Sequence, residues 1–293
     1  MSIELLFEAL ISDCTYICLM IIFPNAKVNL GLHVIEKRAD GFHNLESIFY
    51  PVGWEDILEV LHDTTKQTGI TFSSSGISIP GNANDNLCVK AYHLISKDYP
   101  MPAVKVHLHK IIPIGAGLGG GSSDAAFFIK ALNELFELNL AWGELHHYAK
   151  QLGSDCSFFI TNKPSLAEGK GDQLESIAIS LTGKFIVIVY PEINVNTADA
   201  YKGITPVKPK IALEKLIVET PFEQWKDVLV NDFEKTVFEK FPAIKLLKEK
   251  MYAAGAVYAA MSGSGSAVYG IFEKKPELEN EFEGKLIFIG ELG

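Results

Sequence analysis

The fold of this chain is decided by the stretch Pro113-Ile114-Gly115-Ala116-Gly117-Leu118-Gly119-Gly120-Gly121-Ser122-Ser123-Asp124-Ala125-Ala126. Five of the seven residues from Gly115 to Gly121 are glycine. Glycine has no side chain, so the backbone N–H groups of such a loop can approach a ligand closely. Unpaired N–H groups at the start of a following helix, with the positive end of its dipole, favour an anion. The stretch therefore predicts an anion site, best suited to a nucleotide phosphate.

The flanking residues predict a strand before the glycines and a helix after them. Val104, Val106 and Leu108 alternate with polar residues, as in a half-buried strand. After the glycines, apolar residues recur at the three- and four-residue steps of one helix face: Ala125, Phe128, Leu132, Leu135 and Leu138. Serine is a favourable cap for the first N–H groups of a helix, so we expect Ser122 or Ser123 in that position.

Other kinds of loop fit this context less well. Gly115, Gly117 and Gly120 satisfy the Gly-x-Gly-x-x-Gly pattern of dinucleotide-binding folds. That pattern needs a second strand ending at an acidic residue about twenty positions later, where this chain predicts helix. The loop of nucleoside triphosphatases ends in Gly-Lys-Ser or Gly-Lys-Thr, and no lysine directly follows these glycines. A turn without a ligand is disfavoured, because five glycines carry a large entropic cost on folding.

Composition restricts the class of protein further. The chain has 293 residues, 48% hydrophobic and 21% charged, which is typical of a soluble globular protein with one large or two ordinary domains. A formal net charge of −10 argues against a general nucleic-acid binder. Four cysteines, at 14, 18, 88 and 156, do not form the paired spacings of zinc sites. We therefore expect a reducing, cytoplasmic setting.

The N-terminus is unusual. Leu5 to Phe23 is largely apolar, yet it contains Glu8 and Asp13 and has no basic start. It is therefore a poor signal peptide and a poor membrane span. We expect residues 1–19 to be a non-native or appended extension, and a peripheral membrane anchor is the alternative.

Strands and helices are predicted in both halves of the chain. Strands are expected at 27–35, 48–50, 57–60, 104–108, 185–190, 267–272 and 286–289. Helices are expected from Asn86 onward, after the glycines, up to Gly153, and around 244–254. The elements do not alternate regularly, which indicates an α+β fold of two lobes with a cleft between them.

Taken together, the motifs of this chain resemble those of the GHMP kinases, which include galactokinase, homoserine kinase and mevalonate kinase. They are Ala-Lys-Val-Asn-Leu at 26–30, Arg-Ala-Asp-Gly-Phe-His at 38–43, the glycine core at 117–123, Leu-Gly-Ser-Asp-Cys at 152–156 and Met-Ser-Gly-Ser-Gly at 261–265. The resemblance runs from about Met20 to the C-terminus. It is strongest for the branch that phosphorylates 4-diphosphocytidyl-2-C-methyl-D-erythritol.

This resemblance implies an ATP-binding N-terminal lobe over residues 20–170 and an α/β-sandwich C-terminal lobe over residues 171–293. It implies an ATP-dependent kinase that acts on the 2-hydroxyl of that small molecule, on the non-mevalonate route to isoprenoid precursors. No nucleic-acid or membrane partner is expected, and the chain would be a monomer or homodimer. Another small-molecule kinase of the superfamily, or a catalytically silent nucleotide-binding regulator, remains the alternative.

The family's catalytic lysine and carboxylate match Lys27 and Asp155. A carboxylate within reach of an alcohol can orient it and accept its proton. The lysine could keep that carboxylate ionised and stabilise charge on the phosphoryl group. Asp155 follows a predicted helix C-terminus, where the dipole disfavours a carboxylate, so we expect a compensating cation beside it.

The resemblance also assigns the binding residues. The triphosphate matches Pro113 to Ser123, with Mg²⁺ at Ser122 or Ser123 and its other ligands unassigned. Asn86 and Leu87 match the adenine site. The substrate residues are Asn29 beside Lys27, Phe42 and Tyr201 on the two faces of cytosine, His43 at its edge, and Thr197 nearby. Phe42 stands where the family has tyrosine, so any contact of that hydroxyl is lost. The turn Ser262–Gly265 should support the phosphate loop or touch the substrate.

Overall fold

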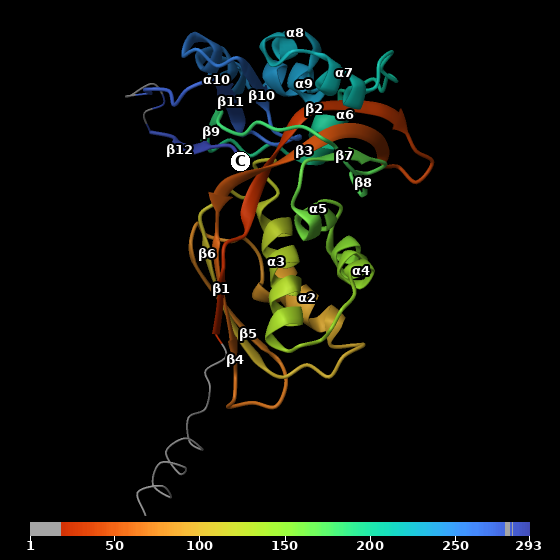
Figure 1. Cartoon of the computed structure of the whole chain (residues 1–293), viewed down its shortest axis with the longest axis vertical. Helices are drawn as coiled ribbons and strands as arrows, with labels where there is room; N and C mark the ends of the chain where they lie inside the picture. Colours follow the sequence, from red (N-terminus) through yellow and green to blue (C-terminus); the bar gives the residue numbers. More distant parts are fainter. Residues whose placement is uncertain (1–18, 279–281, 283) are drawn as a thin grey trace, which may run out of the picture.

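One four-stranded sheet and four helices build the lower lobe in Figure 1. The computed structural model describes residues 19–278, 282 and 284–293. The sheet order is β1 (Leu19–Ile22), β4 (Ile57–His62), β6 (Val104–Lys110) and β5 (Ile70–Gly76). After a short turn η1 (Ala83–Asp85), the helices are α2 (Leu87–Ile95), α3 (Gly120–Leu135), α4 (Trp142–Leu152) and α5 (Cys156–Thr161). Their apolar faces and the strands share one core, which includes Leu58, Val106 and Phe128.

The upper lobe is an antiparallel sheet covered by short helices. Its strand order is β10 (Tyr258–Met261), β11 (Val268–Phe272), β9 (Phe185–Tyr190) and β12 (Leu286–Glu291). The helices are α6 (Thr197–Lys202), α7 (Leu213–Glu219), η2 (Phe222–Gln224), α8 (Trp225–Val228), α9 (Phe233–Lys240) and α10 (Pro242–Ala253). The packing of α6, α9 and α10 on β9–β11 closes a second core.

A third sheet joins the lobes. Its order is β2 (Asn25–Lys37), β3 (His43–Glu55), β7 (Ser165–Glu168) and β8 (Gln173–Ser176), all antiparallel. In Figure 1 strand β2 runs upward from the lower lobe into the upper one. The first eight residues of β2 are all buried, so both of its faces are covered. Because side chains alternate along a strand, this arrangement points Val28 and Leu30 into one core and leaves Lys27 and Asn29 on the opposite side.

Most elements predicted from the sequence are confirmed, including the α+β class and the alternation along β6. Two predicted helix ends are too long, since Leu138 and Ala254 lie beyond α3 and α10. Residues 1–18 of the expected extension lie outside the described residues, while Leu19 begins β1 and pairs with Leu61. The expected domain boundary at residue 170 falls between β7 and β8 and stays a prediction.

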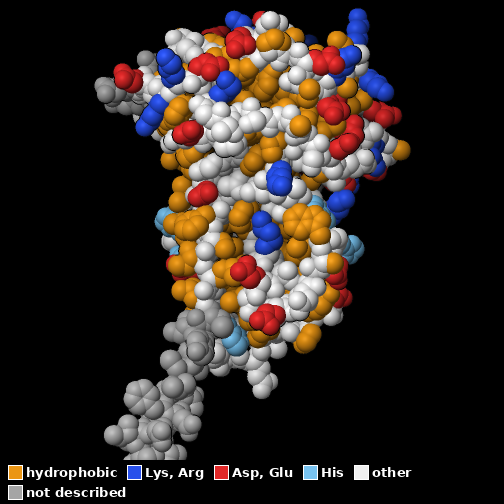
Figure 2. Space-filling model, in the orientation of Figure 1, with side chains coloured by type: hydrophobic (Ala, Val, Ile, Leu, Met, Phe, Trp, Pro, Cys, Tyr) orange, Lys and Arg blue, Asp and Glu red, His pale blue; other side chains and the backbone are white. Residues whose placement is uncertain are grey.

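The surface carries mixed charge. Figure 2 shows acidic and basic side chains interspersed over the visible face of both lobes. Within the described ranges, no helix combines the length and apolar character needed to cross a membrane.

The lobes meet through a close backbone contact at Gly117, which can be tested by adding one methyl group. A Cβ there would lie 1.9 Å from the carbonyl oxygen of Ser262, and φ is +82°. We expect Gly117→Ala to lower the free energy of unfolding by about 3 kcal/mol, through strain and overpacking. Gly183→Ala is the control, because its φ is +81° and nothing lies within 4 Å of its added Cβ.

Gly183→Ala should cost only about 1 kcal/mol, the strain of the left-handed backbone alone. Urea unfolding of both variants measures the difference. Equal losses in the two variants would mean that the lobes do not meet closely at Gly117.

Candidate active site

The glycine loop takes a left-handed backbone at alternate positions. Gly115, Gly117 and Gly119 have φ of +70°, +82° and +73°, while Ala116 and Leu118 between them are buried. Side chains are rarely tolerated at such angles, which explains the spacing of these three glycines. The backbone of the three glycines is thus accessible to a ligand, and the buried side chains of Ala116 and Leu118 hold the loop in place.

The predicted serine cap of α3 is wrong. Gly119 is the cap residue, without a side-chain hydrogen bond, and the helix begins at Gly120. The left-handed turn at Gly119 starts the helix earlier than expected, so Ser122 and Ser123 lie in its first turn. Ser122 is half-buried and lines a cavity, whereas Ser123 is fully buried and its hydroxyl has no hydrogen-bond partner among the described residues.

A second glycine turn, Ser262–Gly265, supports the loop from the upper lobe. The Ser262 hydroxyl donates to the Gly117 carbonyl at 2.8 Å, and the Ala267 N–H donates to the Ala116 carbonyl at 3.2 Å. A Cβ on Gly265 would lie 2.1 Å from the Ala116 carbonyl carbon, so only glycine fits there. The expected contact between this turn and the phosphate loop is confirmed, and the turn also lines the cleft described next.

Two cavities meet at the glycine loop. The larger has a volume of about 940 Å³ and is lined by Lys27, Asp155 and every substrate residue expected from the sequence: Asn29, Phe42, His43, Thr197 and Tyr201. The smaller, about 380 Å³, is lined by Asn86, Leu87 and the stretch 113–122. Gly115, Gly117 and Gly119 line both. Of the expected nucleotide residues, Ser123 alone does not line the smaller cavity.

Lys27 and Asp155 come together in the larger cavity. Lys27 Nζ lies 3.5 Å from Asp155 Oδ2, donates to Asn29 Oδ1 at 2.5 Å and sits 4.6 Å from the centre of the Phe49 ring. Burial lowers the pKa of Lys27, and the nearby Asp155 carboxylate opposes that effect. The Lys27 backbone N–H donates to the Leu118 carbonyl at 2.9 Å, so strand β2 holds the amine against the loop.

The electrostatic setting of Asp155 differs from the expected one. Asp155 follows the end of α4, where Gly153 is the C-cap residue, but it also occupies the N-cap position of α5, without a side-chain hydrogen bond to that helix. A helix N-terminus favours a carboxylate, so the dipole of α4 does not by itself require the cation. The pair with Lys27 forms for another reason: the ammonium is buried and needs a negative partner.

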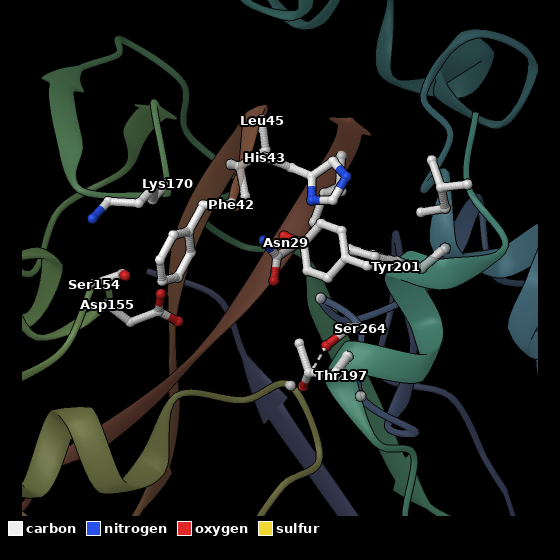
Figure 3. A pocket seen from close by; sticks show the side chains of 18 of the residues that line it. Asn29, Phe42, His43, Leu45, Ser154, Asp155, Lys170, Thr197, Tyr201 and Ser264 are labelled. Carbon is white, nitrogen blue, oxygen red and sulfur yellow. Dashed lines mark hydrogen bonds between the residues drawn. The ribbon is translucent and has the colours of Figure 1, made fainter. Parts of the chain in front are cut away.

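The aromatic residues of the cleft are arranged differently from the expected sandwich. His43 lies on Tyr201, with ring centroids 4.7 Å apart and planes 17° apart. Phe42 stands away from both, beside Asp155 (Figure 3), and is 59% exposed. The ring stacked on Tyr201 is therefore His43, and Phe42 contributes an exposed face to the same cavity.

Three further residues contribute to the site but are difficult to identify from the sequence. Asn231 donates from its amide to the carbonyls of Met261 and Gly263, both at 2.8 Å, and so holds the second glycine turn. Tyr269 donates to the Asn29 carbonyl at 2.6 Å. Lys170 lies between two glycines of left-handed φ, lines the cleft and places its amine 4.9 Å from the Phe42 ring centre. The Gly-Lys-Gly pattern at 169–171 is the only one of these visible in the sequence.

Comparison with known proteins agrees with this geometry. A family model described as GHMP kinases N terminal domain matches residues 86–163, and one described as GHMP kinases C terminal matches residues 213–284. The chain is 53% identical to a 4-diphosphocytidyl-2-C-methyl-D-erythritol kinase of Cytophaga hutchinsonii, over 89% of this chain and 96% of that protein. It is 48% identical to the enzyme of the same name from Bacteroides thetaiotaomicron, over 92% and 98%.

Solved structures lead to the same family. A crystal structure of 4-(cytidine 5'-diphospho)-2C-methyl-D-erythritol kinase superposes with a TM-score of 0.79 at 31% identity, covering 94% of this chain and 99% of that one. The mevalonate kinase of Methanococcus jannaschii, at 19% identity, shares the fold with a TM-score of 0.66, over 94% and 98%. The chain therefore belongs to the GHMP kinases and, within them, to the 4-diphosphocytidyl-2-C-methyl-D-erythritol kinase family.

Proposed function

We propose that this chain transfers the γ-phosphoryl group of ATP to the 2-hydroxyl of 4-diphosphocytidyl-2-C-methyl-D-erythritol. The observation that carries the proposal is that the two cavities meet at Gly115, Gly117 and Gly119, which line both. A nucleotide in the smaller cavity would place its terminal phosphate at these glycines, where an alcohol in the larger cavity would meet it. Lys27 and Asp155 line the larger cavity.

ATP fits the smaller cavity through backbone contacts. The N–H groups of the loop and of the first turn of α3 would hold the phosphates, with the helix dipole favouring negative charge. Asn86 and Leu87 line the opposite part of this cavity and would border the adenine. The Asn86 side chain caps α2 by accepting from the Cys88 N–H at 2.9 Å, so it fixes the shape of that border.

Mg²⁺ would accompany the nucleotide, and the first turn of α3 offers one ligand for it. The Ser122 hydroxyl lines the nucleotide cavity, whereas the buried Ser123 does not. Mg²⁺ keeps several waters and binds largely through substrate phosphates, so it needs few protein ligands. When bound, it would neutralise charge on the phosphates.

Asp155 would act as the proton acceptor. As the 2-hydroxyl oxygen forms its bond to the γ-phosphorus, the bond from phosphorus to the β-bridging oxygen breaks, and the hydroxyl proton passes to Asp155. ADP and the phosphorylated alcohol are the products. The Lys27 ammonium, held by Asn29, would keep Asp155 ionised and stabilise the charge that develops on the transferred group.

The cytosine of the alcohol would lie at the stack of His43 on Tyr201, the aromatic end of the cleft. Tyr201 offers the face that His43 covers, and the exposed Phe42 ring lines the same cavity. We propose that cytosine takes the place of His43 on Tyr201, after which the imidazole can hydrogen-bond the edge of the base. Thr197 and Asn29 line the same cavity (Figure 3).

A turnover assay tests the proposed function. ATP consumption is measured with 4-diphosphocytidyl-2-C-methyl-D-erythritol and, separately, with galactose, homoserine and mevalonate. We expect turnover with the cytidyl compound alone, because the others lack a base to occupy the aromatic end. Turnover of mevalonate without the cytidyl compound rejects this substrate, and ATP binding without any turnover favours a silent regulator.

Substitution of the two catalytic candidates tests their roles. We expect Asp155→Asn and Lys27→Ala each to lower kcat by about a thousandfold while the KM for ATP changes little, since neither residue lines the nucleotide cavity. Lys130→Ala is the control, because Lys130 is a half-buried lysine that lines neither cavity. A loss confined to KM in the two variants would assign them to binding instead.

The ion pair itself makes a separate prediction. Asp155 raises the pKa of Lys27 against the lowering effect of burial, so Asp155→Asn should lower that pKa further. NMR titration of protein with ¹³C-labelled lysine measures it, with Lys27→Arg to assign the signal. Lys130, whose pKa burial lowers to about 8, serves as the internal reference and should not move. A Lys27 pKa unchanged by Asp155→Asn would mean that the pair does not interact in solution.

A further inference from the structure

Three charged side chains are buried together beneath the glycine loop. Lys110 is the last residue of β6, Asp124 lies in α3 just after the loop, and Asp56 lies between β3 and β4. The Lys110 amine donates to Asp56 and, at 2.7 Å, to Asp124 Oδ2. All three residues are at most 3% exposed.

The cluster joins the two ends of the phosphate loop. The loop runs between Lys110 and the start of α3, so the bond from Lys110 to Asp124 closes it across its base. Asp56 also accepts from the N–H groups of Ile111 and Ile112, at 2.5 and 2.9 Å. The first residues of the loop are therefore fixed by the same carboxylate that holds the lysine.

The surroundings of Gly120 show how closely the cluster contacts the loop. A Cβ on Gly120 would lie 2.9 Å from Lys110 Nζ and 2.9 Å from Ile112 Cγ2. The amine thus occupies the space that a side chain at this position would need. One glycine of the motif is required by the lysine underneath rather than by an approaching ligand.

Stability alone does not explain the cluster. Buried ion pairs often gain little over apolar residues of the same size, because each charge loses its hydration. Asp124 Oδ1 is buried and has no hydrogen-bond partner in the part of the chain that the structure describes. Lys110 and Asp124 both line the nucleotide cavity, and neither lines the cavity of Lys27 and Asp155.

We propose that Asp56, Lys110 and Asp124 are positioning residues that hold the two ends of the glycine loop together and so fix the N–H groups that bind the nucleotide phosphates. They act through the loop and do not contact the reacting atoms. Only the choice of ATP as ligand rests on the proposed function. Asparagine keeps a side-chain oxygen that can accept from Lys110, so it is a close substitute for Asp124.

The test compares nucleotide binding with stability in matched variants. Asp124→Ala removes the acceptor of Lys110, and Asp124→Asn keeps one. Asp63→Ala is the control, because Asp63 is also buried, also has one oxygen without a partner and lies 3.3 Å from a lysine, Lys105. It lies next to His62, at the opposite end of β4 from Asp56. Calorimetry with a non-hydrolysable ATP analogue gives Kd, and urea unfolding gives stability.

We expect Asp124→Ala to raise the Kd by at least about tenfold, Asp124→Asn to restore it to within about threefold, and Asp63→Ala to lower stability without changing Kd. Equal Kd changes in Asp124→Ala and Asp63→Ala would overturn the proposal, and so would a failure of Asp124→Asn to restore binding. If Asp124→Ala does not fold, Asp124→Ser takes its place, and native affinity in that variant overturns the proposal. A native protein that binds the analogue but does not phosphorylate the cytidyl alcohol rejects the proposed function alone.

Discussion

The close approach of two backbones, at Gly117 and Gly265, is the contact on which the site depends. The Ser262 hydroxyl and the Ala267 N–H bond to carbonyls of the glycine loop, and neither glycine could carry a side chain without a clash. The loop belongs to the lower lobe and the second turn to the upper lobe. This contact therefore sets the position of the phosphate loop relative to the lobe that carries Tyr201 and Thr197.

A chain of polar contacts extends from this junction to the catalytic candidates. The Asn29 side-chain oxygen accepts from the Lys27 amine and lies 3.4 Å from the Ser262 hydroxyl oxygen, whose proton bonds the Gly117 carbonyl at 2.8 Å. Its amide donates to the Ser47 hydroxyl at 2.8 Å. Asn29 thus contacts strand β3, the second turn and the buried amine. Such a network orients an ammonium that burial alone would destabilise.

The sequence was sufficient to predict what depends on local pattern. The alternation along β6, the helix after the glycines and the strand Phe185–Tyr190 follow from periodicity, and each is confirmed. The family motifs predict the pairing of Lys27 with Asp155. The helix-dipole argument for that pair considers α4 alone and is incomplete, because α5 begins directly after Asp155. Six residues form α5, too few for a clear periodic signal.

What could not be predicted depends on contacts between distant segments. Nothing local distinguishes Asn231 from a surface asparagine, since its role arises from carbonyls 30 and 32 residues away. Ser123 looks like its neighbour Ser122, and only the direction of the first turn of α3 separates a buried hydroxyl from one in the cavity. The stack of His43 on Tyr201 joins β3 to α6 and has no sequence pattern at all.

The meeting of two cavities at Gly115, Gly117 and Gly119 has a consequence for how a site of this architecture can change. The smaller cavity is lined mainly by the start of α2, the glycine loop and the first turn of α3. Lys27, His43 and Tyr201 reach the larger cavity from β2, β3 and α6. The residues common to both linings are these three glycines, which carry no side chains. A substitution in β2, β3 or α6 can therefore reshape the larger cavity without replacing any side chain that lines the smaller one.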